Sequence, residues 1–401
     1  MSKFHSYLNT ASGIIKSYSG DLPLSVFLKS FFSANKKYGS KDRKQIAHTC
    51  YCYFRLGKII DKISLNDNDE LLKQYVLAGL FVCADKPNQM LGALVPGWND
   101  KAHLPIEEKC IFLKDTGLPV EINNVFPWPE LLSNDIDHHR FCRSFFIQPD
   151  LFLRVRPGHQ SNIIKKLSDA QIAFSVKGKG ALALPNLTKI DDVISPDEEV
   201  VVQDYSSQSV REFFKTVKEN NEQSVKVWDC CAASGGKSIL AIDYFGNVDL
   251  TVSDIRASIL INLQSRFRRA GISRYRSFVA DLSLHNTPAD PSGYDLVICD
   301  APCSGSGTWS RTPEQLYFWE ENKLDHYTEL QKKITSNIIP FIKPGGCLLY
   351  ITCSVFKREN EAIVEMIKKQ FNLALIQMHV IKGYNERADT MFGALLRKGN
   401  D

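Results

Sequence analysis

The feature that most constrains this chain is an alternation of short apolar strands and helical segments that begins near residue 225. Strands that alternate with helices in this way pair in parallel through right-handed crossovers. The sequence therefore predicts an α/β fold built on a parallel, doubly wound sheet. The predicted strands are 225–229, 249–254, 276–281, 294–300 and 345–352, and the predicted helices are 237–245, 258–271 and 359–371.

A polar side chain stands at or just beyond the carboxyl end of each predicted strand: Asp229, Asp254, Asp281, Asp300 and Cys353. In open parallel sheets, ligands bind in the crevice outside these strand ends. We therefore expect the five side chains to converge on one crevice.

Composition places the chain among ordinary globular proteins. Its 401 residues, 44% hydrophobic and 23% charged, suffice for two or three domains. A formal net charge of +4 permits nucleic-acid binding without arguing for it. There is no apolar run long enough to span a membrane, and the first residues lack a signal-peptide core. We therefore expect a cytoplasmic protein with no membrane partner.

The cysteines do not form the even framework of a small secreted domain, because there are 11 of them in a long chain. No C-x-x-C pair occurs, so we expect no metal site. Cys50 and Cys52 lie in an apolar run and are interpreted as buried core thiols. The informative thiols are Cys303 and Cys353, each just after a predicted strand.

Residues 1–140 are predicted to form a mainly helical domain, with helices over Ser25–Phe32 and Lys44–Lys62. Basic residues cluster around the turn between them. This cluster could meet several phosphates together, or it could be a solvated helix face. Residues 86–140 are rich in proline, glycine and asparagine and are predicted to link two domains. The clustered basic residues are Lys36, Lys37, Lys41, Arg43 and Lys44.

From Phe141, a strand, a helix and another strand predict a small α/β unit. The expected organisation is a helical domain over 1–140, a small α/β subdomain over 141–200 and a catalytic domain over 201–401.

The segment DCCAASGGKS joins the first predicted strand of the sheet to its helix. A P-loop needs glycine where this chain has Cys231, so a phosphate cradle is incomplete. Gly235 and Gly236 let the backbone approach a ligand beside the free N–H groups of a helix N-terminus. Asp254 is placed to accept two ribose hydroxyls, and Asp281 to accept from an adenine amino group. Adenine, ribose and a carboxylate without phosphate describe S-adenosylmethionine; alternatively, each Asp is only a cap or turn residue.

The thiols suggest methylation at carbon, since the Asn/Asp-Pro-Pro-aromatic turn expected for exocyclic amines is absent. Cytosine C5 is too weak a nucleophile to accept a methyl group directly. A thiolate that adds to C6 activates C5 and leaves once the C5 proton is lost. We therefore expect one of Cys303 and Cys353 to be a nucleophile with a lowered pKa, and the other to assist proton removal or release.

These segments resemble, in order and spacing, the motifs of the Sun/Fmu (RsmB-like) family of RNA 5-methylcytosine methyltransferases. The family implies a Rossmann-like class I methyltransferase sheet, S-adenosylmethionine as cofactor and RNA as partner, with no obligate protein partner. The matching segments are DCCAASGGKS, SDIRAS, VADLS, YDLVICDAPCSGSGTWSRTPE and YITCSVFKRENEAIV, with QDYSSQ before them and ADTMFGALLRK as the final strand.

The resemblance also implies residue roles. Cys353 would be the nucleophile and Cys303 the helper in its release, while Asp300 would contact the cofactor and orient the cytosine. Ser234 stands where the family usually has proline, and this should loosen the glycine loop slightly. Ile259 and Ser310 replace arginines, which concerns substrate contacts. The implied cofactor-binding residues are Cys231, Ala232, Ala233, Ser234, Gly235, Gly236, Lys237, Asp254, Asp281 and Asp300.

Several alternatives stay open. Ribosomal RNA is the expected substrate and tRNA the alternative. Residues 141–200 would be an RRM-like RNA-binding subdomain, and 1–140 resembles a helical RNA-binding region of some members. A catalytically inactive ribosome-assembly factor would share the fold, whereas a P-loop nucleotidase is disfavoured by Cys231. DNA cytosine methyltransferases use the Pro-Cys thiol as nucleophile, which would exchange the roles of Cys303 and Cys353.

Overall fold

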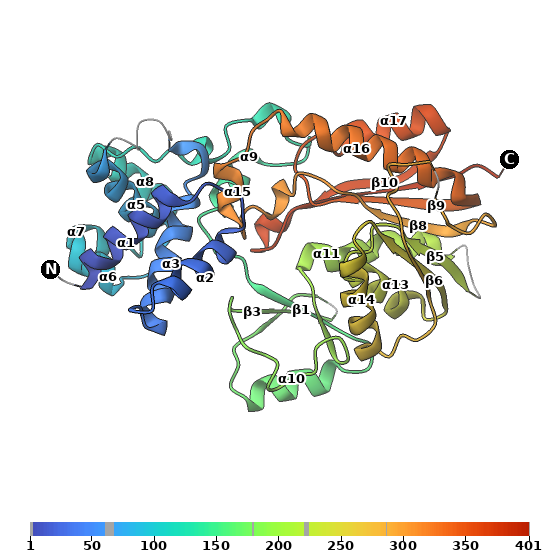
Figure 1. Cartoon of the computed structure of the whole chain (residues 1–401), viewed down its shortest axis with the longest axis horizontal. Helices are drawn as coiled ribbons and strands as arrows, with labels where there is room; N and C mark the ends of the chain where they lie inside the picture. Colours follow the sequence, from blue (N-terminus) through green and yellow to red (C-terminus); the bar gives the residue numbers. More distant parts are fainter. Residues whose placement is uncertain (1–2, 61–67, 179, 220–223, 286, 401) are drawn as a thin grey trace. The chain divides into compact units, whose positions relative to one another are not determined.

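The computed structural model describes residues 3–60, 68–178, 180–219, 224–285 and 287–400 (Figure 1). The chain divides into two compact units. The first comprises Met1–Glu130, Asp137–Gln148 and Trp309–Glu320, and the second comprises Leu131–Ile136, Pro149–Thr308 and Glu321–Asp401. The second unit therefore resumes at Pro149, later than the predicted start at Phe141.

The first unit is helical, as predicted for the N-terminal region. Its α3 ends at Phe54, well before the predicted Lys62, which lies outside the described residues. Residues 86–130 belong to this unit, so the expectation that 86–140 links two domains is wrong. The helices are α1 (Lys3–Ser17), α2 (Leu24–Ala34), α3 (Ser40–Phe54), α5 (Asp69–Cys83), α6 (Gln89–Leu94), α7 (Pro96–Asn99), α8 (Ile106–Asp115), α9 (His138–Ser144) and α15 (Pro313–Tyr317).

Aromatic packing explains why the distant segment Trp309–Glu320 joins these helices. The rings of Tyr18 and Phe318 meet edge to face at 5.4 Å, and those of Phe54 and Tyr317 at 5.3 Å. Such pairs add to the free energy gained by burying the rings. The apolar core of the first unit is therefore completed by residues from the C-terminal half of the sequence.

The second unit contains a small antiparallel sheet with strand order β2-β3-β1-β4. Its core consists of strand residues packed against α10, including Leu153, Ile163, Leu167 and Leu182. The elements are β1 (Leu151–Val155), α10 (Gln160–Asp169), β2 (Ser175–Val176), β3 (Ala181–Leu184) and β4 (Val200–Val202).

The large sheet of the second unit has seven strands in the order β10-β11-β9-β8-β5-β6-β7. Strands β7, β6, β5, β8 and β9 pair in parallel, which confirms the predicted α/β fold. The strands are β5 (Val225–Asp229), β6 (Val248–Asp254), β7 (Arg276–Val279), β8 (Tyr294–Asp300), β9 (Ile342–Thr352), β10 (Ala374–Ile381) and β11 (Met391–Arg397).

One edge of the large sheet differs from the purely parallel prediction. Strand β11 pairs antiparallel with β9, and β10 pairs antiparallel with β11. The sequence analysis anticipated β11 as a final strand, but it did not anticipate β10. The two strands form the outer edge of the sheet beyond β9.

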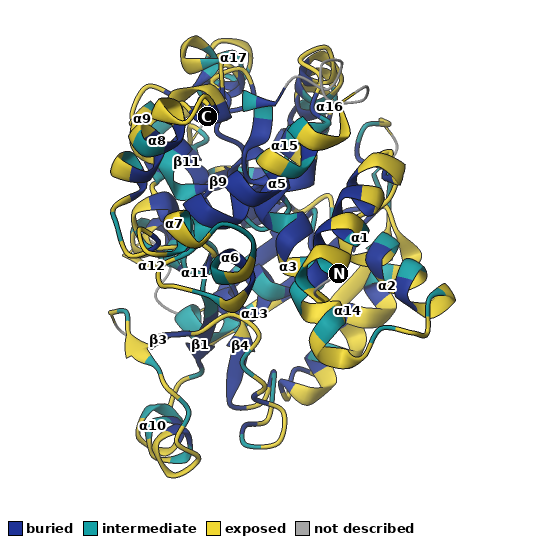
Figure 2. Ribbon diagram, turned by 90° about the vertical axis from the view of Figure 1, so that its left-hand side faces the viewer, coloured by how far each residue is buried: buried dark blue, intermediate teal, exposed yellow. Residues whose placement is uncertain are grey.

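Helices cover both faces of the large sheet (Figure 1). One core contains residues of α13 (Gly236–Phe245) and α14 (Ala257–Arg269), and the other contains residues of α16 (Lys323–Ile338) and α17 (Glu361–Phe371). In Figure 2 strand β9 is dark blue over most of its length, because it is buried between these two layers. Two short helices, α11 (Tyr205–Ser209) and α12 (Phe214–Glu219), precede β5.

The strand order reverses at β5, which has β6 on one side and β8 on the other. Crossovers leave this point in opposite directions, so a crevice opens beyond the carboxyl ends of the two strands. Among the described residues, no helix combines the length and apolarity needed to cross a membrane.

Candidate active site

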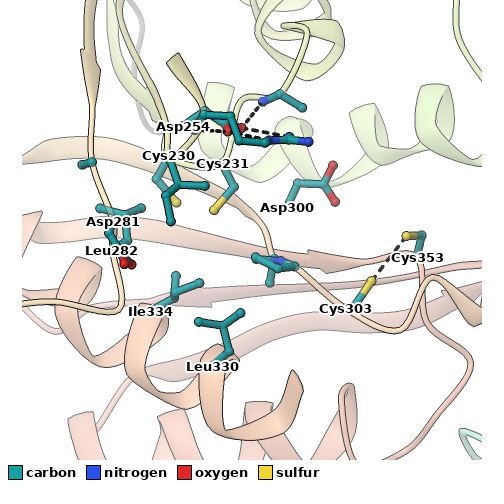
Figure 3. A pocket seen from close by; sticks show the side chains of 16 residues that line it. Cys230, Cys231, Asp254, Asp281, Leu282, Asp300, Cys303, Leu330, Ile334 and Cys353 are labelled. Carbon is teal, nitrogen blue, oxygen red and sulfur yellow. Dashed lines mark hydrogen bonds and ion pairs between the residues drawn. The ribbon is translucent and has the colours of Figure 1, made fainter. Parts of the chain in front are cut away.

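A cavity of about 590 Å³ lies beyond the carboxyl ends of the parallel strands (Figure 3). Four of the five predicted strand-end residues line it: Asp254, Asp281, Asp300 and Cys353. The fifth, Asp229, lines a neighbouring cavity of about 190 Å³ instead. The expectation of one common crevice is thus wrong for Asp229, whose buried carboxylate accepts a hydrogen bond of 2.6 Å from the Ser238 hydroxyl.

The glycine loop adopts a conformation that requires glycine at residue 235. Its φ is +83°, and an added Cβ would lie 2.6 Å from the ring of Phe267. The loop bends here so that α13 begins directly behind it. Ser234 accepts hydrogen bonds from Arg266 at both its hydroxyl and its carbonyl oxygen. Arg266 therefore holds the glycine loop in place, whereas we expected serine at residue 234 to loosen it.

The loop residues predicted to bind a cofactor divide between the two cavities. Cys231 and Ala233 line both of them. Gly235 lines neither, since it serves to turn the backbone. The residues that line only the smaller cavity are Ala232, Ser234, Gly236 and Lys237.

The carboxylate of Asp254 is fixed by donors of Ala233 and Arg256. Its Oδ2 accepts from the backbone N–H of Ala233 at 3.0 Å, and its Oδ1 accepts from the backbone N–H and Nε of Arg256 at 3.0 and 3.1 Å. The Oδ1 of Asp281 accepts from the backbone N–H and the hydroxyl of Ser283. Both carboxylates lie in the cavity wall, at the ends of the second and third parallel strands (Figure 3).

Asp300 ends β8 and lines both cavities. Its Oδ2 lies 2.6 Å from Nζ of Lys237. Burial acts to lower the pKa of Lys237, but the Asp300 carboxylate outweighs it, and the pKa is raised. Lys237 is therefore a cation in the wall of the smaller cavity, where Ser207 Oγ lies 3.4 Å from its Nζ.

The two thiols singled out in the sequence lie together. The Sγ atoms of Cys303 and Cys353 are 3.3 Å apart, and both residues line the larger cavity (Figure 3). The hydrogen bond to Cys353, burial, and the charges of Cys353 and Glu359 raise the pKa of Cys303 well above its ordinary value. Cys303 is therefore a neutral thiol beside a second sulfur atom.

A buried carboxylate holds the two thiol-bearing loops. Glu359 has no exposed surface. Its Oε2 accepts hydrogen bonds of 2.5 Å from the hydroxyls of Ser304 and Ser354, the residues that follow the two cysteines. Its Oε1 accepts from the backbone N–H of Ser304 and from Nε2 of Gln331. The carboxylate thus links both loops to α16.

The sequence analysis missed Glu359 and Gln331, and it missed the α16 side chains Leu330 and Ile334, which form an apolar wall of the larger cavity. The sequence of α16 did contain a pattern that could have predicted this helix. Its buried residues recur at helical spacing: Leu324, Thr328, Gln331, Thr335 and Ile338. For Glu359, the sequence gives no sign of its burial.

The part of the chain that carries this site is similar to known proteins. Residues 215–393 match the family model of the 16S rRNA methyltransferases RsmB/F. The ribosomal RNA small subunit methyltransferase B of Xanthomonas campestris pv. campestris is 32% identical over 168 residues, which cover 42% of this chain and 37% of that protein. Alignments with the first curated relatives span only 36% to 40% of their lengths.

Solved structures share the fold. The crystal structure of PH0851 superposes with a TM-score of 0.69 and 18% sequence identity, and the match covers 98% of both chains. The structure of NSun6 from Pyrococcus horikoshii with SFG gives a TM-score of 0.59 at 13% identity, covering 71% of this chain and 99% of that one. The predicted Rossmann-like α/β fold is confirmed.

Proposed function

We propose that this protein transfers a methyl group from S-adenosylmethionine to C5 of a cytosine in ribosomal RNA, because residues 215–393 match the model of the RsmB/F methyltransferases. One observation carries this proposal beyond the family. Two thiols lie 3.3 Å apart in the wall of a cavity that also contains the carboxylates of Asp254, Asp281 and Asp300. A covalent route through C6 needs a thiolate at the site of methyl transfer.

The larger cavity contains hydrogen-bond acceptors that would suit S-adenosylmethionine. Asp254 would accept from the ribose hydroxyls, and Asp281 from the adenine amino group. Leu282, Leu330 and Ile334 offer apolar surface to a base. The use of this cofactor agrees with the family and with the related fold solved with SFG, an analogue of S-adenosylmethionine. When bound, the cofactor supplies a methyl group on a positively charged sulfur.

The chain's own residues would prepare cytosine to receive that methyl group. The thiolate of Cys353 adds to C6, a C–S bond forms, and the electron pair of the C5–C6 double bond makes C5 nucleophilic. After C5 is methylated, its proton passes to a water molecule acting as base, the C6–S bond breaks and Cys353 leaves as a thiolate, which restores the C5–C6 double bond. The neutral Cys303 assists this release, since its raised pKa disfavours the thiolate needed for attack.

The smaller cavity would orient the base. Asp300 borders both cavities and is paired with Lys237, so a carboxylate and an ammonium group stand beside the reacting thiols. The carboxylate can accept from the cytosine amino group, and the ammonium group can donate to its ring nitrogen or carbonyl. Residues 141–200 and the helical 1–140 would hold the surrounding RNA.

The test combines product analysis with two variants. The full chain, methyl-labelled S-adenosylmethionine and small-subunit rRNA should yield labelled 5-methylcytosine. Cys353→Ala should abolish the product, whereas Cys303→Ala should accumulate a covalent protein–RNA complex that resists denaturing electrophoresis. A complex that forms with Cys353→Ala instead would reverse the two roles. Labelling of tRNA in place of rRNA would identify tRNA as the substrate. Labelling of neither RNA would contradict the proposal.

A further inference from the structure

Three further cysteines gather beside the larger cavity, apart from the reacting pair. The Sγ atoms of Cys230, Cys231 and Cys299 all lie within 4.8 Å of one another. Cys230 and Cys299 are 1% and 0% exposed, and the three residues are free thiols. The proposed methyl transfer uses neither Cys230 nor Cys299.

The sheet topology brings these thiols together. Strands β5 and β8 are parallel neighbours in which Asp229 pairs with Ile298, so Cys230 and Cys299 follow at the same level. The backbone N–H of Cys230 donates to the carbonyl of Ile298 at 2.9 Å, which holds the two strand ends in register. Cys231 comes next along the loop. The sequence search for C-x-x-C spacing could not detect a cluster assembled across two strands.

We propose that Cys230, Cys231 and Cys299 form a binding site for a soft, thiophilic metal ion of the Zn²⁺ class in the wall of the methyl-donor cavity. Sulfur ligands of a tetrahedral zinc ion lie about 3.8 Å apart, given Zn–S bonds of about 2.3 Å. The cluster needs only a small inward movement to reach this spacing. Three protein ligands leave the fourth position open toward the cavity, which Cys230 and Cys231 line (Figure 3).

The charges around the cluster favour a cation. Cys230 follows Asp229 at the end of β5, and Cys299 precedes Asp300 at the end of β8, so two acidic side chains stand next to the ligands in the chain. Acidic groups of this kind attract a cation, and thiolate ligands select zinc-like ions over hard, oxygen-seeking ones.

Occupancy of the site would affect the methyl donor. This consequence rests on the proposed function, because it assumes that the donor occupies the same cavity. An ion at Cys230 and Cys231 stands in the wall that the donor would contact, so each should weaken binding of the other by the same factor. The metal site itself does not depend on methyl transfer.

The experiment measures metal binding directly, in the full chain carrying Cys303→Ser and Cys353→Ser so that the reacting thiols do not contribute. After treatment with a chelator, Cd²⁺ is titrated in. We expect an ultraviolet thiolate-to-cadmium charge-transfer band that saturates at one equivalent. Cys299→Ala in this background should weaken Cd²⁺ binding by about tenfold or more, because one of three ligands is lost.

Cys347→Ala is the matched control, since Cys347 is also a buried strand cysteine of the same sheet, and it should leave the titration unchanged. In case Cys299→Ala fails to fold, zinc K-edge absorption of the background protein gives a second measurement, with three sulfur neighbours at about 2.3 Å expected. A missing charge-transfer band, or a zinc shell of nitrogen and oxygen alone, would overturn the proposal.

S-adenosylhomocysteine should weaken Cd²⁺ binding in the same titration. If S-adenosylhomocysteine has no effect while the absorption spectrum still shows the sulfur neighbours, the shared cavity is contradicted but the metal site is not.

Discussion

The positions of the Cys303 and Cys353 thiols depend on a buried carboxylate. Glu359 is fully buried and accepts hydrogen bonds from the residues that follow Cys303 and Cys353. A carboxylate placed in this way fixes the relative position of two loops that are 50 residues apart in the sequence. We therefore regard Glu359 as a positioning residue for the sulfur atoms of Cys303 and Cys353.

Glu359→Gln should lower kcat by about 100-fold while leaving the KM for S-adenosylmethionine nearly unchanged. The amide replaces one acceptor oxygen with a donor, so either the two serine hydroxyls that share Oε2, or the Ser304 N–H and the Gln331 amide that share Oε1, lose their acceptor. Loss of the negative charge should also lower the pKa of Cys303 and move the alkaline limb of the pH–rate profile to lower pH. Steady-state kinetics across a pH series measures both effects.

Glu365→Gln provides the control, because Glu365 forms an exposed ion pair with Lys368 on α17. It should leave kcat and the pH profile as they are. If Glu359→Gln changed stability alone, with an unshifted pH profile, its role would be structural.

Asp229 should make the stability of the protein depend on pH. Burial raises its pKa to about 7 from an ordinary value of 3.8. Its protonated form is therefore favoured by folding, and this contribution is fully present below about pH 4 and is lost as pH rises through about pH 7. Between these pH values the free energy of unfolding of the wild type should fall by on the order of a few kcal/mol, and in Asp229→Asn this fall should be absent.

Guanidinium unfolding followed by the fluorescence of the buried Trp228 would measure this difference at several pH values. Asp249→Asn, at an exposed ion pair with Arg276 on the same sheet, should keep the original pH dependence. Equal slopes for the wild type and Asp229→Asn between about pH 4 and pH 7 would exclude a protonated Asp229.

At the residue scale, position along predicted strands was a reliable guide to the site. Asp254, Asp281, Asp300, Cys303 and Cys353 were all placed from the strand ends, and all of them line the larger cavity. Their roles in binding and catalysis stay predictions. Glu359 could not be placed, because its burial results from packing among α16, α17 and two loops.

Elements were predicted well where their residues are apolar and poorly where they lie at the edge or surface. The buried strands β8 and β9 contain continuous apolar runs, which is typical of parallel strands covered on both faces. Strand β10 lies at the sheet edge and only Val380 is buried, so its apolar alternation is weak. Helix α16 is amphipathic with a charged outer face, and several of its buried residues are polar, so its apolar periodicity is weak.

A single glycine couples the thiol-bearing loops to the antiparallel strand β11. The backbone N–H of Gly307 donates to the carbonyl of Cys353 at 2.8 Å, and its carbonyl accepts from the N–H of Thr390 at 2.9 Å. An added Cβ would lie 1.9 Å from the carbonyl oxygen of Thr390. Only glycine lets the three backbone segments come this close.

Gly307→Ala should lower the free energy of unfolding by on the order of 2 kcal/mol and reduce methyl transfer by more than tenfold, as the Cys303 and Cys353 loops are forced apart. Thermal unfolding and product formation would be measured together. Gly13→Ala, on an exposed position of α1 with nothing within 4 Å, should instead stabilise the chain by about 0.5–1 kcal/mol. An unchanged activity for Gly307→Ala would contradict the coupling.

At the scale of the whole molecule, the sequence could not reveal that the helical unit is discontinuous. The segment Trp309–Glu320 belongs to that unit although it lies between β8 and α16 of the other. Local patterns identify elements, but the partner of an apolar segment is set by long-range packing. The predicted domain boundaries therefore treated 201–401 as one continuous part.

Removing residues 1–130 should leave a chain that self-associates. Trp309, Leu316 and Trp319 are buried in the intact protein, and the segment that bears them would lose the helices with which it forms one unit. Exposed apolar surface of this kind promotes association. Size-exclusion chromatography and the fluorescence of a hydrophobic dye would detect it.

The same deletion carrying Leu316→Ser and Phe318→Ser should associate less, because the uncovered surface is more polar. A monomeric deletion chain that binds no dye would show that the segment finds other partners within the remaining residues.

Because Trp309–Glu320 belongs to the helical unit, related genes of this kind cannot be recombined freely. One crossover between related sequences would combine the N-terminal helices of one parent with the 309–320 stretch of the other, and the aromatic contacts of Tyr18 and Phe54 with Phe318 and Tyr317 would be mismatched. Viable chimaeras should therefore carry paired crossovers that transfer both stretches together, so that the N-terminal helices and the segment that packs against them come from the same parent.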